Sequence, residues 1–236
     1  MSIHLIIDAG NTYVKAALFN GEAMLFVFSF QRGENWHDKL EGYKPEKVIV
    51  SNVGEHFADL YFEEVPTLIL NENTPLPIGN DYETPHSLGK DRIAAAVGAW
   101  NRFKNNNILI IDAGTCITYD IVNNNGIYLG GIIAPGMYMR LQAMNHFTAR
   151  LPLPEWDENA PLVGTDTISC MQSGAVNGIL SEAEGIIRRM DEKYSDLQVV
   201  ICGGASSFFE SKLNFRIFAA PYLVLEGLNS ILIYND

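Results

Sequence analysis

Short apolar runs that end in a polar turn occur twice in the chain. Residues 3–7 lead into Asp8-Ala-Gly-Asn-Thr12, and residues 108–111 lead into Asp112-Ala-Gly-Thr115. Each run has the length of a buried strand, and a second strand, a turn ending in Asn-Gly and a third strand follow it. The pattern predicts two copies of one three-stranded antiparallel unit, spaced by about one hundred residues.

Outside the two copies the pattern changes. Further strands are expected at residues 47–50, 66–70 and 198–201, and helices at residues 34–40, 89–100, 137–147, 167–194 and 222–234. The segment 71–87 is rich in Asn, Pro, Gly and Thr and predicts a long loop, and loops of this length are often functional. We expect an α/β protein with two domains, residues 1–107 and 108–236.

Composition and charge limit the classes of ligand and partner that the chain is expected to bind. The chain has 236 residues, of which 47% are hydrophobic and 19% charged, as in globular proteins with modest cores. The net charge of −12 and the lack of a Lys/Arg run argue against a nucleic-acid partner, so an anionic ligand needs help from amides, local cations or metal ions. Three widely spaced cysteines, no signal-peptide pattern and no membrane-length apolar run favour a cytoplasmic protein without a membrane partner.

The first turn has the residue types that bind a phosphate and a hard cation. Gly10 lets a ligand approach the backbone, and the amides of Asn11 and Thr12 can cradle a phosphate. Lys15 can reach a phosphate oxygen, and Asp8 can hold Mg²⁺ directly or through water. A plain hairpin is the alternative for one such turn. The second turn repeats the acid at the end of a buried strand, where a carboxylate needs a partner, and this favours the phosphate-and-cation interpretation.

Other polar residues lie at expected element ends. Asp91 is either a first-turn acid of a helix or a general base that accepts a hydroxyl proton. Arg92 is either a surface residue or a ligand for an anion on the acceptor. Gly203 and Gly204 form either a helix-entry turn or a flat surface for adenine or ribose, and Thr167 either caps a helix or faces the acceptor. P-loop and dinucleotide-fold glycine motifs do not occur in the sequence.

As a set, these motifs resemble the type III pantothenate kinase family, within the acetate kinase, sugar kinase and actin superfamily. The matching pieces are Asp8-Ala-Gly-Asn-Thr-Tyr-Val-Lys15, Gly89-Lys-Asp-Arg92, Asp112-Ala-Gly-Thr-Cys-Ile-Thr118, Gly130-Gly-Ile-Ile-Ala-Pro-Gly136, Gly164-Thr-Asp-Thr167 and Gly203-Gly204. The resemblance implies two ribonuclease-H-like (actin-like ATPase) α/β domains with a nucleotide cleft between them. It also implies ATP-dependent phosphorylation of pantothenate, the first step toward coenzyme A. One position departs from the family, because Cys202 stands where a Thr usually precedes the two glycines.

The resemblance implies roles for individual residues. The implied ATP-binding residues are Asp8, Ala9, Gly10, Asn11, Thr12, Tyr13, Val14, Lys15, Thr115, Gly203 and Gly204. The implied pantothenate-binding residues are Tyr82, Gly89, Lys90, Asp91, Arg92 and Thr167. Asp91 is implied as the catalytic base, Asp112 as the ligand of a monovalent cation (K⁺ or NH₄⁺), and Asp8 as the Mg²⁺ ligand, directly or through water. A homodimer with acceptor pockets near its interface is also implied.

Two other functions stay open at this level. A sugar kinase, an acyl-acid kinase or a polyphosphate phosphatase would use the same turns, and ADP release across candidate acceptors would distinguish them. A nucleotide-gated regulator or filament protein would bind ATP without turnover on any acceptor. The sequence has no basic run that would serve a DNA-binding regulator.

Overall fold

The computed structural model describes residues 2–10, 13–31, 33–40, 42–51 and 65–236. These residues form two compact units. The first unit comprises Met1–Lys104, Asn125–Leu129 and Tyr222–Asp236, and the second comprises Asn105–Asn124 and Gly130–Pro221. The chain first passes between the units close to the division expected at residue 107, but two later segments return to the first unit.

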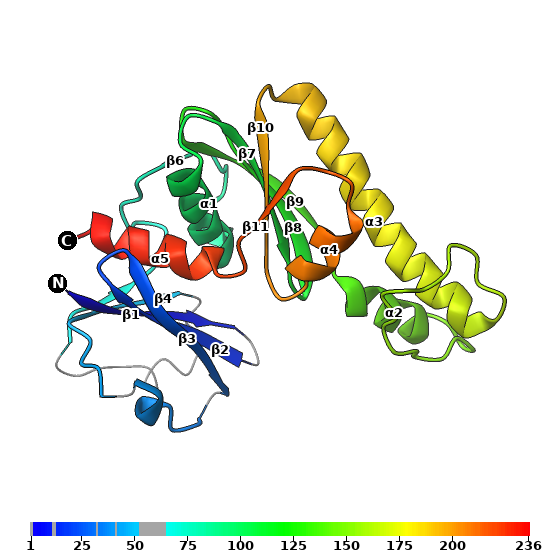
Figure 1. Ribbon diagram of the computed structural model, residues 1–236, viewed down its shortest axis with the longest axis horizontal. Helices are drawn as coiled ribbons and strands as arrows, with labels where there is room; N and C mark the ends of the chain where they lie inside the picture. The colour runs from blue at the N-terminus through cyan, green and yellow to red at the C-terminus, as the bar shows by residue number, and fades with distance from the viewer. Residues whose placement is uncertain (1, 11–12, 32, 41, 52–64) are drawn as a thin grey trace. The chain divides into compact units, whose positions relative to one another are not determined.

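The first unit contains a five-stranded sheet in the order β3-β2-β1-β4-β5 (Figure 1). Its strands are β1 (Ile3–Ala9), β2 (Tyr13–Asn20), β3 (Ala23–Gln31), β4 (Lys47–Ser51) and β5 (Thr67–Ile69). The antiparallel pairing of β1 with β2 and of β2 with β3 confirms the predicted opening unit, and β4 pairs with β1 in parallel. Leu5 and Ile7 of β1 face a core that includes Trp36, so the alternation of strand side chains places Asp8 on the opposite face.

The second unit repeats this sheet. Its strands belong to a six-stranded sheet in the order β11-β10-β7-β8-β9-β6, where β6 is Gly79–Asn80, and the first five strands match β5-β4-β1-β2-β3 strand for strand. The bounds are β7 (Asn107–Ala113), β8 (Cys116–Val122), β9 (Ile127–Pro135), β10 (Leu197–Cys202) and β11 (Ile217–Ala219). Leu109 and Ile111 of β7 face the main core, so Asp112 lies on the opposite face, as Asp8 does in the first copy. The repeat predicted from the two turns is therefore confirmed as a repeat of sheet order and of side-chain phase.

Helices lie where the pattern predicted them, with small shifts at their ends. They are η1 (His37–Leu40), η3 (Pro85–Ser87), α1 (Lys90–Arg102), α2 (Met137–His146), α3 (Thr167–Lys193), α4 (Ser206–Lys212) and α5 (Leu223–Tyr234). The segment expected as one long loop also contains the two-residue strand β6 (Gly79–Asn80) and η3. In the described part of the chain, no helix is both long and apolar enough to cross a bilayer.

The last helix, α5, belongs to the first unit because it packs against α1 with almost no space between the backbones. A Cβ added to Gly227 would lie 1.8 Å from the carbonyl oxygen of Ala94, and one added to Gly98 would lie 2.6 Å from that of Leu223. Glycine on both helices therefore permits a backbone approach that any side chain would prevent. The prediction of two consecutive domains, 1–107 and 108–236, therefore misses that α5 belongs to the first unit.

Candidate active site

Asp8 is the second-last residue of β1 and lies between two polar neighbours on adjacent strands. In the sheet register, Asp8 pairs with Lys15 of β2 on one side and with Ser51 of β4 on the other. The buried Ser51 hydroxyl donates a hydrogen bond to Asp8 Oδ1 at 2.6 Å. Because residues opposite one another in a sheet share a face, the three side chains form a row in which a hydroxyl orients the carboxylate and an exposed lysine lies beside it.

The turn after Asp8 needs its glycine. A Cβ on Gly10 would lie 2.8 Å from the carbonyl oxygen of Tyr13. Ala9 and Val14 pair with each other, and both side chains are buried in the core, so only their backbone can contact a nucleotide. Asn11 and Thr12, both expected to bind phosphate, lie outside the described residues.

The acid expected to be the base lies in the first turn of α1. Asp91 is half-buried, and its Oδ1 accepts a hydrogen bond from the backbone N–H of Arg92 at 2.9 Å. The N-cap residue Gly89 has no side chain to bind the free amides, and a Cβ there would lie 2.5 Å from Asp91 Oδ1. Asp91 therefore lies in the first turn of α1, where the helix dipole favours a negative charge. This position is also compatible with a role as a general base.

Tyr82 lies in the loop before α1 and Arg92 lies in the first turn of α1, and their side chains are in contact. The Arg92 guanidinium lies over the Tyr82 ring, 5.7 Å from its centroid, and Arg92 is only 7% exposed. The interpretation of Arg92 as a surface residue is therefore wrong. The Tyr82 ring also packs at a tilt against the Tyr128 ring, with 6.1 Å between their centroids, a spacing typical of aromatic pairs. The backbone N–H of Tyr82 donates a hydrogen bond to Asn80 Oδ1.

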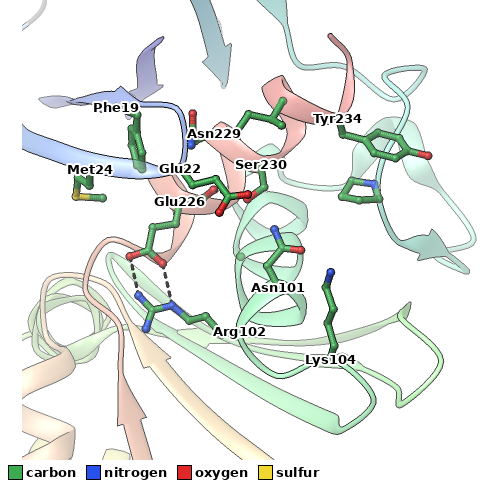
Figure 2. A pocket seen from close by; sticks show the side chains of 13 residues that line it. Phe19, Glu22, Met24, Asn101, Arg102, Lys104, Glu226, Asn229, Ser230 and Tyr234 are labelled. Atoms are coloured by element: carbon green, nitrogen blue, oxygen red, sulfur yellow. Dashed lines mark hydrogen bonds and ion pairs between the residues drawn. The ribbon is translucent and has the colours of Figure 1, made fainter. Parts of the chain in front are cut away.

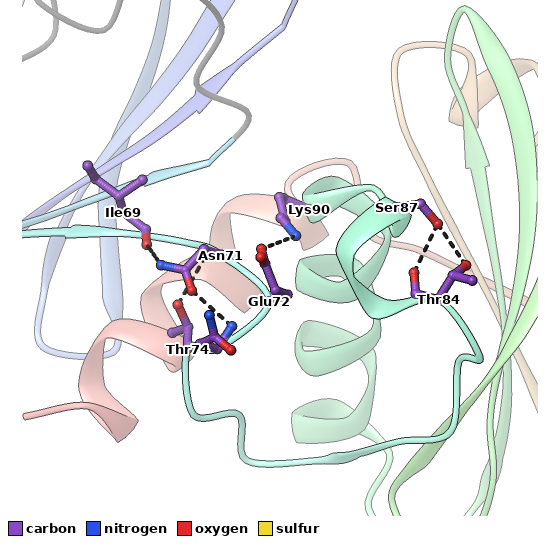
Figure 3. A network of polar contacts seen from close by, with 8 residues as sticks. Ile69, Asn71, Glu72, Thr74, Thr84, Ser87 and Lys90 are labelled. Atoms are coloured by element: carbon purple, nitrogen blue, oxygen red, sulfur yellow. Dashed lines mark hydrogen bonds and ion pairs between the residues drawn. The ribbon is translucent and has the colours of Figure 1, made fainter.

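The loop that leads to α1 is held by local hydrogen bonds (Figure 3). Asn71 and Thr74 close a turn, and the Ser87 hydroxyl donates to the Thr84 hydroxyl at 2.7 Å. Lys90 forms an ion pair with Glu72, with 3.7 Å between Nζ and Oε2. The segment before Asp91 is thereby tied to the helix that carries it.

The second turn repeats the row of three. Asp112 is the second-last residue of β7 and pairs with Thr118 of β8 and with Cys202 of β10. Thr118 thus takes the place of Lys15, and Cys202 that of Ser51. The Thr118 Oγ1 atom is buried and has no hydrogen-bond partner in the part of the chain that the structure describes.

Gly203 and Gly204 differ in their surroundings. Gly203 has φ of +84°, and a Cβ there would lie 2.3 Å from Asp112 Oδ1. Gly204 is exposed, and a Cβ there would meet no atom within 4 Å. Thr115 is also exposed, and its carbonyl oxygen accepts a hydrogen bond from Gly136 N–H at 3.1 Å. The first glycine is thus required by the protein itself, and the second leaves open space beside the turn.

The start of α3 is capped by Asp166 and not by Thr167. Asp166 accepts hydrogen bonds from the N–H groups of Ile168 and Ser169, and Ser169 completes a capping box. These hydrogen bonds hold the pKa of the Asp166 carboxyl below its ordinary value, and the bond from the Ser169 backbone N–H has the largest effect. The interpretation of Thr167 as the cap is wrong, and its side chain is exposed at the helix start.

A buried polar group joins β8 to the helices of the second unit. Tyr119 is fully buried, and its hydroxyl donates to Glu182 Oε1 at 3.1 Å. Burial raises the pKa of Tyr119, and the Glu182 charge raises it further. Arg140 pairs with Glu182 at 2.8 Å and donates to the Pro135 carbonyl, so α2, α3 and the end of β9 are held next to the second turn.

Metal-binding groups are sparse. Among the described residues, no three His, Cys, Asp or Glu side chains gather in a way that could hold a metal ion. Mg²⁺ in phosphate-transfer sites is usually held by one or two carboxylates together with substrate phosphates and water. The single oriented carboxylate of Asp8 fits that kind of site.

A cavity of about 640 Å³ lies in the first unit (Figure 2), within the usual size range of small-molecule pockets. Arg102 and Glu226 form a two-bond ion pair on its wall, at 2.9 and 2.7 Å. None of the residues expected to bind ATP or pantothenate lines it. The cavity is therefore separate from the candidate site.

A family model of type III pantothenate kinase matches residues 4–189. The chain belongs to the type III pantothenate kinase family. A type III pantothenate kinase of Bacteroides fragilis is 44% identical over 240 residues and covers 99% of both chains. That of Cytophaga hutchinsonii is 41% identical over 234 residues and covers 99% of this chain and 100% of its own length.

Solved structures support the fold of this family member. A Campylobacter jejuni protein described as a Baf family transcriptional activator superposes with a TM-score of 0.63 at 22% identity, over 98% of each chain. Structural neighbours also include a glucokinase, a protein described as an N-acetylmannosamine kinase, and a dehydratase activator solved with bound ADPNP, and the chain shares their two-domain α/β fold, that of actin-like ATPases. The fold class predicted from the two turns is confirmed.

Two residues of the site were missed from the sequence, Ser51 and Thr118. Ser51 directly follows a buried apolar run, as Cys202 does in the second copy. The available signal for Ser51 was its position as a polar residue at the end of a strand. To connect Ser51 with Asp8, however, one must know that β4 lies beside β1. To connect Thr118 with Asp112, one must know the register between β8 and β7.

Proposed function

We propose that this chain transfers the γ-phosphate of ATP to the primary hydroxyl of pantothenate and so forms 4'-phosphopantothenate, the first step of coenzyme A biosynthesis. The observation that carries the proposal is the placement of Asp91 in the first turn of α1, beside the buried Arg92 and its partner Tyr82. Membership of the family supports pantothenate as the acceptor.

The turns supply the nucleotide contacts. In the first unit, residues 8–15 bind the ATP phosphates, with Lys15 as a positive charge and Asp8 as the Mg²⁺ ligand, directly or through water. In the second unit, Thr115, Gly203 and Gly204 contact the nucleotide. When bound, Mg²⁺ neutralises phosphate charge, and the oriented Asp8 holds it in one place.

Asp91 is the base in this proposal. Its carboxylate accepts the proton of the pantothenate hydroxyl as that oxygen forms the new bond to phosphorus. Arg92 binds the pantothenate carboxylate, because its guanidinium is buried and positioned by Tyr82. Gly89 and Lys90 at the helix start and Thr167 at the start of α3 complete the acceptor contacts.

Asp112 is the proposed ligand of a monovalent cation, K⁺ or NH₄⁺. Its carboxylate ends a buried strand on the face opposite the main core, with the buried Thr118 hydroxyl as its register neighbour. An ion at this position would supply the positive charge that Lys15 supplies beside Asp8. The residues present therefore fit a cation site.

A homodimer is proposed as the working form. Large apolar side chains are exposed at both ends of α2 and around the start of α3, namely Tyr138, Phe147, Leu162, Val163 and Ile168. Exposed apolar groups of this kind mark protein interfaces. Light scattering of the wild type and of a Leu162→Ser, Val163→Ser double variant tests this proposal. A monomer mass for both proteins would contradict it.

A cytoplasmic location stays a prediction.

The test of the reaction is ADP formation with and without pantothenate, in K⁺ buffer. Asp91→Asn should bind ATP normally but lower kcat by about two to four orders of magnitude, as loss of a general base does. The matched control is Asp38→Asn, the same change at an exposed acid of η1, which should leave kcat unchanged. ATP binding without turnover would instead favour a regulator, and turnover on a sugar alone would favour another kinase.

A further inference from the structure

The Thr118 hydroxyl is buried, and no group among the described residues hydrogen-bonds to its Oγ1. A buried polar group without a partner destabilises the folded state, and proteins rarely leave one in place. Valine has nearly the same shape without this cost. The hydroxyl at Thr118 therefore requires a reason outside the protein's own hydrogen bonds.

The sheet places this hydroxyl beside the Asp112 carboxylate. Thr118 pairs directly with Asp112 between β8 and β7, and such residues share a face with their Cβ atoms about 4.5–5.5 Å apart. The flanking Ile117 and Tyr119 point into the main core on the opposite face. Two oxygen-bearing groups thus face the same space, yet no hydrogen bond joins the Thr118 hydroxyl to the carboxylate.

The first copy of the repeat shows what occupies the equivalent place. There the register partner of Asp8 is Lys15, whose ammonium supplies positive charge beside the carboxylate. In the second copy the partner is a neutral hydroxyl, which offers lone pairs and no charge. A bound cation at Thr118 would restore the charge that the lysine provides in the first copy.

We propose that Thr118 Oγ1 is a ligand, together with Asp112, of the monovalent cation. The proposal rests on the proposed role of Asp112. Potassium ions are held by rings of uncharged oxygens that replace hydration water, and a hydroxyl with free lone pairs is such an oxygen. The positive charge beside Asp112 in the second turn then comes from the bound ion, whereas the positive charge beside Asp8 in the first turn comes from Lys15.

The experiment compares Thr118→Val with Thr118→Ser, which removes or keeps the hydroxyl. Thermal unfolding and binding of a non-hydrolysable ATP analogue are measured in KCl and in tetramethylammonium chloride at equal ionic strength. The wild type should gain both thermal stability and analogue affinity in KCl. Thr118→Val should be at least as stable as the wild type in tetramethylammonium, because it removes an unsatisfied group.

In KCl, Thr118→Val should need at least tenfold more K⁺ to reach half of its response, and Thr118→Ser should recover the wild-type value to within about threefold, given that its hydroxyl offers the same lone pairs. Thr148→Val is the control, because the Thr148 hydroxyl bonds the Met144 carbonyl on an exposed turn. It should leave the K⁺ response unchanged.

Two results would overturn the inference. One is a Thr118→Val protein whose K⁺ response equals that of the wild type while Asp112→Asn loses it. The other is a wild type that responds equally to both salts, which would remove the cation site itself. Pantothenate-dependent ADP formation is measured separately, so loss of the cation site and loss of the proposed reaction are told apart.

Discussion

The adjacent glycines of the second turn allow a structural requirement to be separated from a binding role. Alanine at Gly203 would take a φ of +84°, which costs an L-residue about 1–2 kcal/mol. Its Cβ would also lie 2.3 Å from Asp112 Oδ1 and 2.7 Å from the Ala113 carbonyl oxygen. Relief of that crowding costs about 1–3 kcal/mol, so Gly203→Ala should lose about 2–5 kcal/mol in total.

Gly204→Ala is the matched control for stability, because its Cβ would meet no atom within 4 Å. The free energy of unfolding should change by less than about 0.5 kcal/mol. If adenine or ribose lies against this backbone, the same methyl should weaken ATP binding at least tenfold in a protein of normal stability.

The assay is urea unfolding followed by hydrogen exchange in peptides of β10 and α4, which report the second unit alone. ATP affinity is measured by calorimetry on the same proteins. Equal stability of the two variants would refute the structural argument. Normal ATP affinity of Gly204→Ala would refute the role of that glycine in binding.

Three further changes test other parts of the structure. Ser51→Ala removes the hydrogen bond that orients Asp8 and should raise the Mg²⁺ concentration for half-maximal ADP formation severalfold, whereas an unchanged Mg²⁺ titration would show that the bond has no such role. Gly227→Ala should lower the melting temperature sharply, while Gly185→Ala on α3, with no atom within 4 Å, should stabilise by up to about 1 kcal/mol; similar melting temperatures would contradict the close packing. Because the folded-state pKa of Asp166 is lowered, its contribution is present above the unfolded pKa and is lost as pH falls through the folded pKa. Asp166→Ala should therefore be less stable than wild type at pH 7, with the difference vanishing in acid.

Local signals in the sequence predicted much of the fold. Each buried run, its turn and its returning strand lie within about twenty residues, where periodicity and turn chemistry suffice to identify them. They also identified Asp8, Asp91 and Asp112 as candidates. Partners that depend on register could not be identified in this way, because Ser51 meets Asp8 across 43 positions of sequence.

The same limit applies to the last helix. Its apolar pattern predicted a helix, but tertiary contacts such as the backbone approach of Gly227 to α1 are needed to assign it to the first unit. Arg92 shows a related limit, because a charged residue at a helix start is usually exposed, whereas here its guanidinium is buried over the ring of Tyr82.

The return of α5 to the first unit has a consequence for the order in which the protein forms on the ribosome. Domains generally fold as they emerge, with the N-terminal one first. Here the first unit lacks α5, and the hydrogen bond from Asn229 to the carbonyl oxygen of Gly21, until α5 has left the exit tunnel. The second unit contains all of its own strands and helices by Pro221. The half of the protein that is translated first is therefore the half that is completed last.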